Sequence, residues 1–421
     1  MTATTAPRSA FRRYWLDIAL WKRIVGALVL GIIAGLIFGP AMSSFSWMGE
    51  LFIRLIRMLV APLVLVVIVS GIASLGDPRK IGTIGVRTLL LYIFTTIVAV
   101  ALGITLALLI EPGIGVTLAL DAPPPPPNPK SFGATMMEIV PINPVAALSE
   151  TKMLSIIFTA IMLGIGSILV GDEAKPLTDL FQAASAVLLK LVTLVMELAP
   201  FGVFALMAQA VGNDGLGAFV SIIWIALCVV IGASLQLIFT HGGLVRIGAG
   251  LSPIRFFRNV SEAMLVGFST ASSSATLPVA MQVADKKLGI RPAVVSTVLP
   301  LGSTMSMDGT AMYMAILCIF AVQAFGVTLS PADYVLLAAV TVTVAMGTAP
   351  IPGSSLFLVA GILATVGVGP EQAALVVAFV LPFDRPLDMI RTVPNVTSDL
   401  SVATVVASME GEIDKDVFNG K

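Results

Sequence analysis

The stretch DRPLDMIRTVPNVTSD at residues 384–399 decides the fold class, because it places five ionisable groups inside an apolar run at residues 373–406. Within this stretch, polar residues recur at helical spacing: Asp388, Arg391, Thr392, Asn395 and Asp399. Positions i, i+3, i+4, i+7 and i+11 share one helix face. Each charge costs about 2.5 to 3.5 kcal/mol at a membrane helix centre, so the group must face protein, water or a ligand. A salt-bridged helix would explain Asp388 and Arg391 alone, so we predict a functional polar face.

Composition places the chain among polytopic membrane proteins. Of its 421 residues, 57% are hydrophobic and 11% are charged, and the mean hydropathy is +1.02. This composition is too apolar for a soluble enzyme. The 24 basic and 24 acidic residues cancel, so no nucleic-acid partner is expected. Cys228 and Cys318 lie in apolar runs and are interpreted as packing residues. The single histidine, His241, ends a hydrophobic segment and is interpreted as an interfacial residue.

Hydropathy predicts long apolar spans near residues 24–44, 51–75, 84–110, 154–170, 178–211 and 217–245. Arg79, Lys80 and Arg87 mark a cytoplasmic loop, and the proline run at residues 121–130 indicates a stiff extracellular spacer. The basic N-terminus leads into a span too long for a cleavable signal. We therefore expect a multi-pass protein of the cell inner (plasma) membrane with both termini in the cytoplasm.

The segment at residues 258–286 is predicted to be a re-entrant hairpin. Its middle reads STASSSATLP at residues 269–278, and basic residues flank both ends. These are Arg246, Arg255, Arg258, Lys286, Lys287 and Arg291. The positive-inside rule assigns both ends to the cytoplasm, so the chain must turn back at membrane depth.

A mirror-image hairpin is predicted at residues 335–368. Its centre reads GTAPIPGSS at residues 347–355, and neither flank carries Lys or Arg, so both ends are assigned to the outside. Each hairpin is followed by a helix that we expect polar residues to interrupt, at residues 306–310 and 384–399. Such an inverted repeat indicates a secondary transporter with its site at the membrane midplane.

Four motifs of the sequence carry a resemblance to a known family: the serine run at residues 272–274, MDGT at residues 307–310, the second hairpin tip, and DxxRTxxNxxxD at residues 388–399. The sequence resembles the glutamate transporter family, the dicarboxylate/amino acid:cation symporters. The resemblance extends from about residue 20 to residue 410. It implies an all-α polytopic membrane protein with eight transmembrane helices plus two re-entrant helical hairpins. It also implies an inverted repeat, a homotrimer in the lipid bilayer, an elevator mechanism and a small-molecule anionic substrate.

The resemblance implies a static scaffold and a moving transport domain. The scaffold would comprise residues 1–80, 144–176 and 177–216, with an extracellular Pro-rich loop at residues 121–143. The transport domain would comprise residues 81–120, 217–250, the first hairpin at 251–290, a seventh transmembrane helix at 291–328, the second hairpin at 329–369, and an eighth helix with a cytoplasmic tail at 370–421.

An acidic amino acid brings one ammonium and two carboxylates, and burial requires a partner for each. Asp388 can take the ammonium, and Arg391 can hold the side-chain carboxylate in a bidentate fork. The α-carboxylate can go to Asn395 and the serine run. With the tip residues of the second hairpin as a lid, the resemblance implies contacts from Ser272, Ser273, Ser274, Thr310, Ile351, Gly353, Asp388, Arg391, Thr392 and Asn395.

Charge accounting predicts coupling to cations. Asp308, Asp388 and Asp399 against Arg391 leave a net charge of −2, which is costly in low dielectric unless cations enter. A substrate of charge −1 entering against a negative interior costs about 2.3 kcal/mol per 100 mV, so at least two positive charges must accompany it. We expect Na⁺, or alternatively H⁺, and no organic cofactor.

The family's sodium positions map onto three groups of oxygen ligands, which suit a hard cation such as Na⁺. The first group is Tyr92, Thr95, Thr96, Ser306 and Asp308. The second is Gly302, Asn395 and Asp399. The third consists of carbonyls near Thr304, Met307, Ala345, Met346 and Thr348. For the Tyr92, Thr95 and Thr96 group, ordinary packing of a membrane helix is the alternative.

Several departures from the family pattern leave the substrate open. Ser306 stands where the family has Asn, which leaves the ion stoichiometry open, and Pro350 replaces a lid glycine. Related carriers place an arginine at the position of Ala271 or of Met389, and here Arg385 stands nearby instead. That arrangement is similar to the C4-dicarboxylate branch, but Asp388 favours an amino acid. An anion channel remains a remote alternative, and an intramembrane protease is disfavoured because GxGD is absent. We predict a symporter for aspartate or glutamate, not an enzyme.

Overall fold

The computed structural model describes residues 18, 20–73, 78–116, 137, 140–214, 218–348 and 353–420, and this part of the chain is almost entirely helical and forms no strand. The first half contains α1 (Leu20–Phe38), η2 (Gly39–Phe45), α2 (Ser46–Ala73), α3 (Pro78–Ile110), α5 (Pro144–Ser149), α6 (Met153–Val170), η3 (Gly171–Ala174), α7 (Lys175–Glu197), α8 (Ala199–Asp214) and α9 (Ala218–Leu235). The second half contains η4 (Gln236–His241), α10 (Gly242–Gly248), α11 (Pro253–Thr270), α12 (Ser273–Lys286), α13 (Pro292–Met305), α14 (Asp308–Ala324), α15 (Pro331–Gly347), α16 (Ser354–Thr365), α17 (Pro370–Glu410) and α18 (Lys415–Phe418). The proline run at residues 121–130 and the predicted lid residues Pro350 and Ile351 lie outside the described residues.

Five helical stretches of the described chain are long and apolar enough to cross a membrane. They are Lys22–Phe52, Thr83–Ile110, Ser155–Glu197, Ile222–Gly248 and Pro292–Ala324. Helices satisfy their own backbone hydrogen bonds, which a lipid environment requires. The prediction of a helical membrane protein is therefore confirmed, while the count of eight membrane helices stays a prediction.

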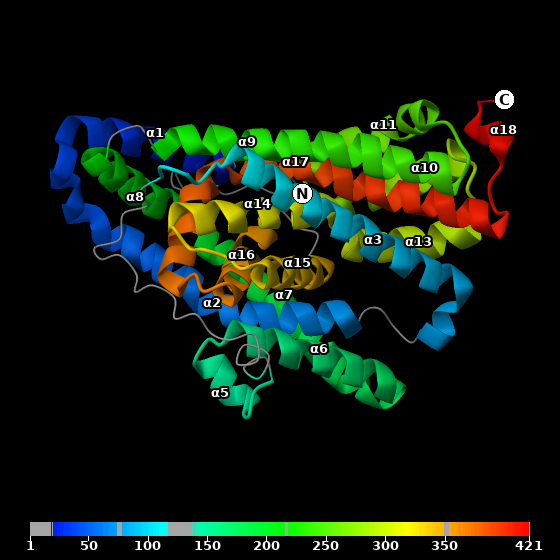
Figure 1. Ribbon diagram of the computed structural model, residues 1–421, viewed down its shortest axis with the longest axis horizontal. Coiled ribbons are helices and arrows are strands. Elements are labelled where there is room, and N and C mark those ends of the chain that lie inside the picture. Colours follow the sequence, from blue (N-terminus) through cyan, green and yellow to red (C-terminus); the bar gives the residue numbers. More distant parts are fainter. Residues whose placement is uncertain are drawn as a thin grey trace, which may run out of the picture.

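The helices form two neighbouring groups (Figure 1). In the first, α1 runs along α8, and α2 packs against α6, α7 and α8. Gly31 and Gly35 of α1 allow this approach, because a Cβ at either position would press on the backbone of α8 at Phe204 or Ala208. In the second group, α3, α9, α13 and α14 surround α17.

The 41-residue helix α17 is the axis of the second group (Figure 1). It continues unbroken through residues 384–399 although it contains Pro382, Pro386 and Pro394, so the predicted interruption there is wrong. Neighbouring helices and polar side chains can satisfy the backbone groups that prolines free inside a bundle. The predicted polar face is confirmed as buried, since each of its five residues leaves at most 5% of its surface exposed.

Two other spans do break. The predicted interruption at residues 306–310 occurs between α13 and α14, where Ser306 and Met307 leave helical geometry. The predicted continuous span at residues 178–211 is instead divided at Leu198 into α7 and α8. Pro200 follows this break, and a proline is accommodated in the first turn of a helix but not in its interior.

The α11–α12 pair forms a helix–turn–helix unit in the first predicted hairpin segment, and the α15–α16 pair lies in the second, where residues 349–352 are outside the described part of the chain. Helices α11 and α12 pack on each other and on α17, and Ala271 turns between them at φ +51°. Helices α15 and α16 also pack on each other, and both contact α14 and α2. Gly71 of α2 meets Gly347 at the end of α15 so closely that a Cβ on Gly71 would collide with the opposing backbone.

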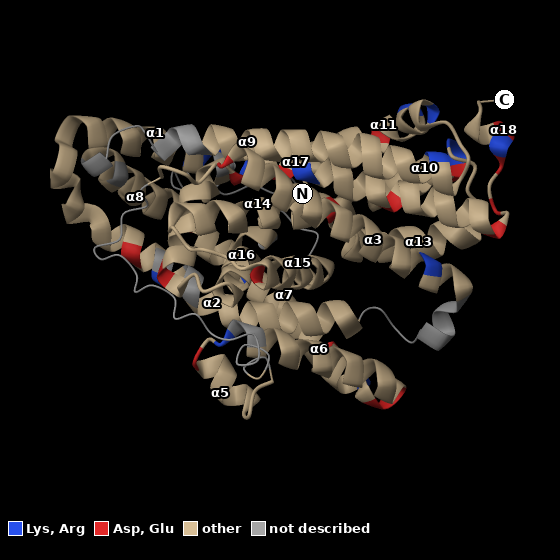
Figure 2. Ribbon diagram, viewed as in Figure 1, with Lys and Arg blue, Asp and Glu red and all other residues tan. Residues whose placement is uncertain are grey.

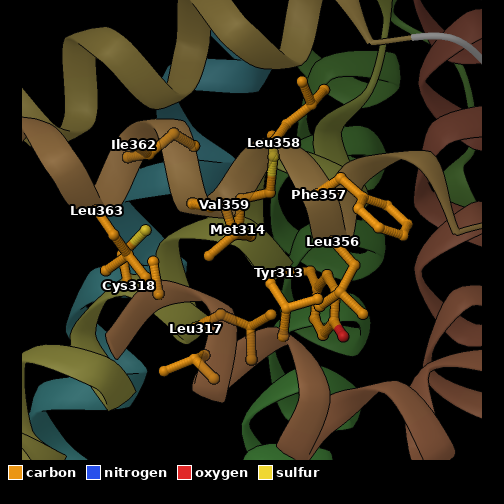
Figure 3. Packing of buried hydrophobic residues seen from close by; sticks show 14 of the residues in the cluster. Tyr313, Met314, Leu317, Cys318, Leu356, Phe357, Leu358, Val359, Ile362 and Leu363 are labelled. Carbon is orange, nitrogen blue, oxygen red and sulfur yellow. The ribbon is translucent and has the colours of Figure 1, made fainter. Parts of the chain in front are cut away.

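Charged residues are concentrated at the end of the molecule that carries α18 (Figure 2). Ion pairs among the described residues of this end include those of Arg87 with Glu410, Lys287 with Glu262, and Arg291 with Glu412. Away from this end, α14 packs apolar side chains against α16, where Tyr313 lies beside Leu356 and Cys318 lies beside Leu363 (Figure 3). This packing holds α14 in place beside the polar face of α17.

Candidate substrate and cation sites

A buried arginine organises the first polar centre. Arg391 is 1% exposed, and its Nη2 lies 2.9 Å from Asp388 Oδ1 while its Nη1 lies 3.2 Å from Asp384 Oδ1. Its guanidinium carbon sits 4.1 Å from the ring centroid of Tyr313, whose hydroxyl donates to Asp384 Oδ1 at 2.8 Å. The guanidinium is thus fixed by two carboxylates and an aromatic face.

Helical spacing explains this centre. Asp384, Asp388 and Arg391 stand at i, i+4 and i+7 of α17, and Tyr313 comes from the neighbouring α14. The second oxygen of Asp388 accepts a hydrogen bond of 3.1 Å from the backbone N–H of Gly353, at the start of α16. Asp388 therefore ties the arginine to the N-terminus of α16.

The N-terminus of α14 forms the next part of the site. Asn395 Oδ1 accepts from the N–H groups of Gly309 at 2.8 Å and Thr310 at 3.4 Å, and Asn395 Nδ2 donates to Thr310 Oγ1 at 3.1 Å. A Cβ on Gly309 would overlap the backbone of Arg391, so the glycine lets α14 reach α17. Thr392 Oγ1 donates to Asp388 O at 2.7 Å. Predicted residues from both helices thus meet.

The serine run is placed differently. Ser272 caps α12 by accepting from Ala275 N at 3.3 Å, Ser273 is buried, and Ser274 is exposed. The first helix–turn–helix unit is joined to α17 through Arg385, whose Nη2 donates to Thr270 O at 3.4 Å. No hydrogen bond among the described residues ties the serine side chains to Arg391 or Asp388, so their contact with substrate stays a prediction.

A second polar centre surrounds Asp308, which is fully buried. Its Oδ1 accepts from Thr95 Oγ1 at 3.2 Å and Thr96 Oγ1 at 2.8 Å, and its Oδ2 accepts from Gln236 Nε2 at 3.1 Å. Three of the residues predicted for the first cation are therefore brought together. No lysine or arginine among the described residues pairs with this carboxylate.

Gly302 leaves a cradle beside that centre. A Cβ at Gly302 would collide with both the Tyr92 hydroxyl and Asp399 Oδ1, so these two oxygens converge on the glycine. Asp399 Oδ1 and Ser306 Oγ are buried and find no hydrogen-bond partner among the described residues. An orphaned buried carboxylate oxygen close to a hydroxyl and a break in a helix suits a hard cation. Tyr92 thus lies closer to the second predicted group than expected.

The third predicted cation group is occupied by local hydrogen bonds. Ala345 O accepts from Thr348 N at 3.0 Å, Met307 O accepts from Ala311 N at 2.7 Å, and the exposed Thr304 donates to Leu301 O at 3.0 Å. Each of these carbonyls keeps a second lone pair. Their role, like that of the half-buried Met346, stays a prediction.

Sequence reasoning missed several members of the two centres: Gln236, His241, Tyr313, Asp384, Ser398 and Ser401. His241 was expected at an interface, and this is wrong, because it is fully buried with Nε2 at 3.6 Å from Asp308 Oδ2. Extending the polar stripe of α17 back by one turn would have found Asp384. Tyr313 and the two residues of η4 carry no comparable signal, because they depend on which helices become neighbours.

The comparisons with known proteins agree with this arrangement. A family model described as "Sodium:dicarboxylate symporter family" matches residues 20–409. The chain belongs to the sodium:dicarboxylate symporter family. It is therefore a membrane transport protein of a cation-coupled family, and the resemblance found in its motifs is confirmed.

Relatives whose names carry different substrates are similar to this chain over nearly its whole length. The proton/sodium-glutamate symport protein of Bacillus subtilis (strain 168) is 33% identical over 408 residues, 94% of each chain. The proton/glutamate-aspartate symporter of Escherichia coli (strain K12) is 32% identical over 420 residues, 95% of each chain. The C4-dicarboxylate transport protein of Rhodospirillum rubrum (strain ATCC 11170) is 30% identical over 418 residues, 97% of this chain and 92% of that protein.

Proposed function

We propose that this protein is a secondary active symporter that imports aspartate or glutamate together with cations, with Na⁺ as the favoured ion. The observation that carries the proposal is the contact between Arg391 and Asp388, buried beside Gly353. In it, a carboxylate of the protein occupies the guanidinium edge that a substrate carboxylate needs.

Exchange at Arg391 explains a preference for amino acids. A substrate carboxylate that displaces Asp388 from the guanidinium keeps a charge-assisted hydrogen bond on the arginine. The released Asp388 is then a buried charge, which is costly unless it is paired. The ammonium of an amino acid supplies that pair, whereas a C4-dicarboxylate supplies none.

The charges of the two centres support cation coupling. The carboxylates Asp308, Asp384, Asp388 and Asp399 carry −4 when ionised. Arg391 and Arg385 return +2, so the sum is −2 before any substrate enters. An added substrate of charge −1 makes the sum −3, and burial of such charge requires cations. The Asp308 centre and the cradle at Gly302 are where we place them.

We further propose an elevator mechanism in a homotrimer, with the two groups of helices as its static and moving parts. We assign α1, α2, α6, α7 and α8 to the scaffold, and α3 with the elements from α9 to α17 to the transport domain. The α11–α12 unit would be the first re-entrant hairpin, and the α15–α16 unit the second. By the positive-inside rule, the charged end beside α18 would face the cytoplasm, together with the C-terminus.

One feature favours a C4-dicarboxylate as the second candidate substrate. Arg385 lies within reach of the serine run through its contact with Thr270 O, so a second carboxylate could find a cation there. The relative from Rhodospirillum rubrum carries that substrate class in its name. The two candidates differ at Asp388: the ammonium of an amino acid would pair with its carboxylate, whereas a C4-dicarboxylate would leave it unpaired.

The test is uptake of labelled aspartate, glutamate and succinate into proteoliposomes that contain the purified protein. A Na⁺ gradient or a pH gradient is imposed separately, with a potassium diffusion potential in either direction. We expect saturable accumulation of aspartate against its gradient, driven by Na⁺ and increased by a negative interior. Equal accumulation of succinate would overturn the amino-acid assignment, and flux that only follows the substrate gradient would indicate a channel.

A further inference from the structure

We propose that Gln236, with His241, is a positioning residue of the cation site at Asp308. Both residues belong to η4 (Gln236–His241), a π-helical turn between α9 and α10. This inference rests on the proposed cation coupling and names residues outside the ligand set predicted from the sequence. It assigns the two oxygens of Asp308 to different tasks.

The π-helical turn is the first observation. Wider i→i+5 turns of this kind are rare and are frequently found at functional sites. Here the turn buries Gln236, Thr240 and His241, which are 0%, 9% and 0% exposed. Burying an amide and an imidazole costs free energy unless they are hydrogen-bonded, so their partners in the structure indicate what these groups do.

The amide of Gln236 is locked in one orientation. Its Nε2 donates to Asp308 Oδ2 at 3.1 Å and to Thr95 O at 3.1 Å, while its Oε1 accepts from Thr240 Oγ1 at 3.0 Å. A flipped amide would set its oxygen against two acceptors. The amide is therefore a fixed donor that holds Oδ2 whether or not a cation is present.

The other oxygen of Asp308 is held by groups that can turn. Thr95 Oγ1 and Thr96 Oγ1 donate to Oδ1, and a hydroxyl can rotate its proton away and present a lone pair instead. Thr95 Oγ1 also lies 3.1 Å from Tyr92 O and 3.4 Å from Ser398 Oγ, so its proton has other acceptors. Oδ1 with the two hydroxyl oxygens is therefore the face that receives the cation.

His241 connects this carboxylate to α17. Its Nδ1 lies 3.1 Å from Ser401 Oγ, and Ser401 Oγ donates to Ser398 O at 3.1 Å. Its Nε2 faces Asp308 Oδ2 at 3.6 Å and has no hydrogen-bond partner among the described residues. The imidazole thereby sets the spacing between Asp308 and the segment of α17 that carries Asp399.

The test measures Na⁺ binding without transport. Thermal unfolding of the detergent-purified protein is followed while NaCl replaces choline chloride at constant ionic strength, because a ligand that binds the folded state raises the melting temperature. The variants are Gln236→Met, which keeps the length of the side chain and removes the donor, and Gln236→Ala. Gln323→Met is the matched control, since the Gln323 amide, at the far end of α14 from Asp308, donates to Ala107 O of α3 and accepts from Gly113 N just after α3.

For Gln236→Met we expect the Na⁺ concentration for half-maximal stabilisation to rise at least about tenfold, the usual effect of one hydrogen bond to a charged group. Aspartate affinity at saturating Na⁺ should remain within about twofold, as one removed contact outside its site predicts. Gln323→Met should leave the Na⁺ dependence unchanged. A purely structural role would instead lower the melting temperature in choline and leave the half-maximal Na⁺ concentration as in the wild type, which would overturn the proposal.

A second pair of variants covers the case in which both Gln236 variants fail to fold. His241→Gln keeps a polar group that can reach Ser401, and we expect it to bind Na⁺ more tightly than His241→Leu. Equal Na⁺ dependence of the two would overturn the role of the turn. If wild-type protein is neither stabilised by Na⁺ nor driven by it in uptake, the proposed function fails at its ion. If Na⁺ stabilises the wild type and the variants show the same Na⁺ dependence, the role of Gln236 and His241 is wrong while the proposed function stands.

Discussion

The two polar centres of this protein are built on opposite principles, although both are buried and share α14 and α17. The centre at Arg391 contains its own cation, and its carboxylates Asp384 and Asp388 are both paired with it. The centre at Asp308 and Asp399 has hydroxyls and an amide but no guanidinium or ammonium among the described residues. One centre is complete by itself, and the other is short of positive charge.

The contrast explains why substrate and cation would enter together. At the complete centre an incoming carboxylate exchanges with one that is already present, so its burial adds a charge that has to be neutralised elsewhere. At the incomplete centre an orphaned carboxylate oxygen gains a partner only when a cation arrives. The two centres meet through Asn395 and Gly309, which link α17 to the start of α14.

The largest effect is expected when the complete centre is broken. Arg391→Ala leaves Asp384 and Asp388 as buried unpaired charges, which costs about 3 to 5 kcal/mol of stability, and removes the proposed carboxylate fork. We expect aspartate uptake to be abolished. Arg391→Lys keeps the charge but not the bidentate geometry, so its uptake should stay at least about tenfold below wild type.

Arg87→Ala is the matched control, because its pair with Glu410 is partly exposed and contributes at most about 1 kcal/mol. Uptake by Arg87→Ala should be close to that of the wild type. Substantial uptake by Arg391→Ala in proteoliposomes of equal protein content would contradict the assignment of Arg391.

The next effect concerns the incomplete centre. Gly302→Ala places a methyl group where the Tyr92 hydroxyl and Asp399 Oδ1 converge, so it fills the cradle while every ligand side chain is kept. We expect Na⁺-dependent uptake to need at least about tenfold more Na⁺, as loss of one ion contact predicts. Gly26→Ala serves as control, since no atom lies near its Cβ position. A normal Na⁺ dependence of Gly302→Ala would place the cation elsewhere.

A third variant sharpens the difference between amino acids and dicarboxylates. Asp388→Ala removes the carboxylate that would meet the ammonium and should lower aspartate uptake more than succinate uptake. A shift in the ratio of the two rates of at least about tenfold is expected from one charge-assisted hydrogen bond. Initial rates for both labelled substrates under the same Na⁺ gradient measure this ratio. An unchanged ratio would argue that Asp388 serves Arg391 alone.

The smallest effect is expected at Thr392. Its hydroxyl donates to Asp388 O within the same helix, so it already has a partner in the absence of substrate. Thr392→Val keeps the shape and removes that bond, and we expect a change in aspartate half-saturation of less than about fivefold. A loss as large as that of Arg391→Ala would show that the hydroxyl contacts substrate directly.

Short-range sequence patterns predicted the features of the fold that are set within a single helix. Helical spacing in residues 388–399 was enough to predict a buried face, and MDGT marked the break between α13 and α14. The same local patterns failed at residues 384–399, where polar residues suggested an interruption of the helix, because the neighbours that support a continuous α17 are distant in sequence. They also failed at Leu198, where the largely apolar span at residues 178–211 is divided just before Pro200.

In the candidate site, too, residues spaced along one helix were predicted, and residues brought together by packing between helices were not. Asp388, Arg391, Asn395 and Asp399 were found because one helix carries them at regular spacing. His241 was misjudged because its place at the end of an apolar run says nothing of Asp308, which α14 brings beside it. Contacts between helices α3, α9 and α14 are set by packing, and a motif within one helix does not encode them.

The central claim is that the complete centre and the incomplete centre fill together. Its most direct test is calorimetric binding of aspartate to the detergent-purified protein over a series of Na⁺ concentrations at constant ionic strength. Reciprocal linkage predicts that aspartate affinity rises steeply with Na⁺ and is nearly absent in choline, and that Na⁺ affinity rises with aspartate by the same factor. Equal aspartate affinity in Na⁺ and in choline would contradict the account.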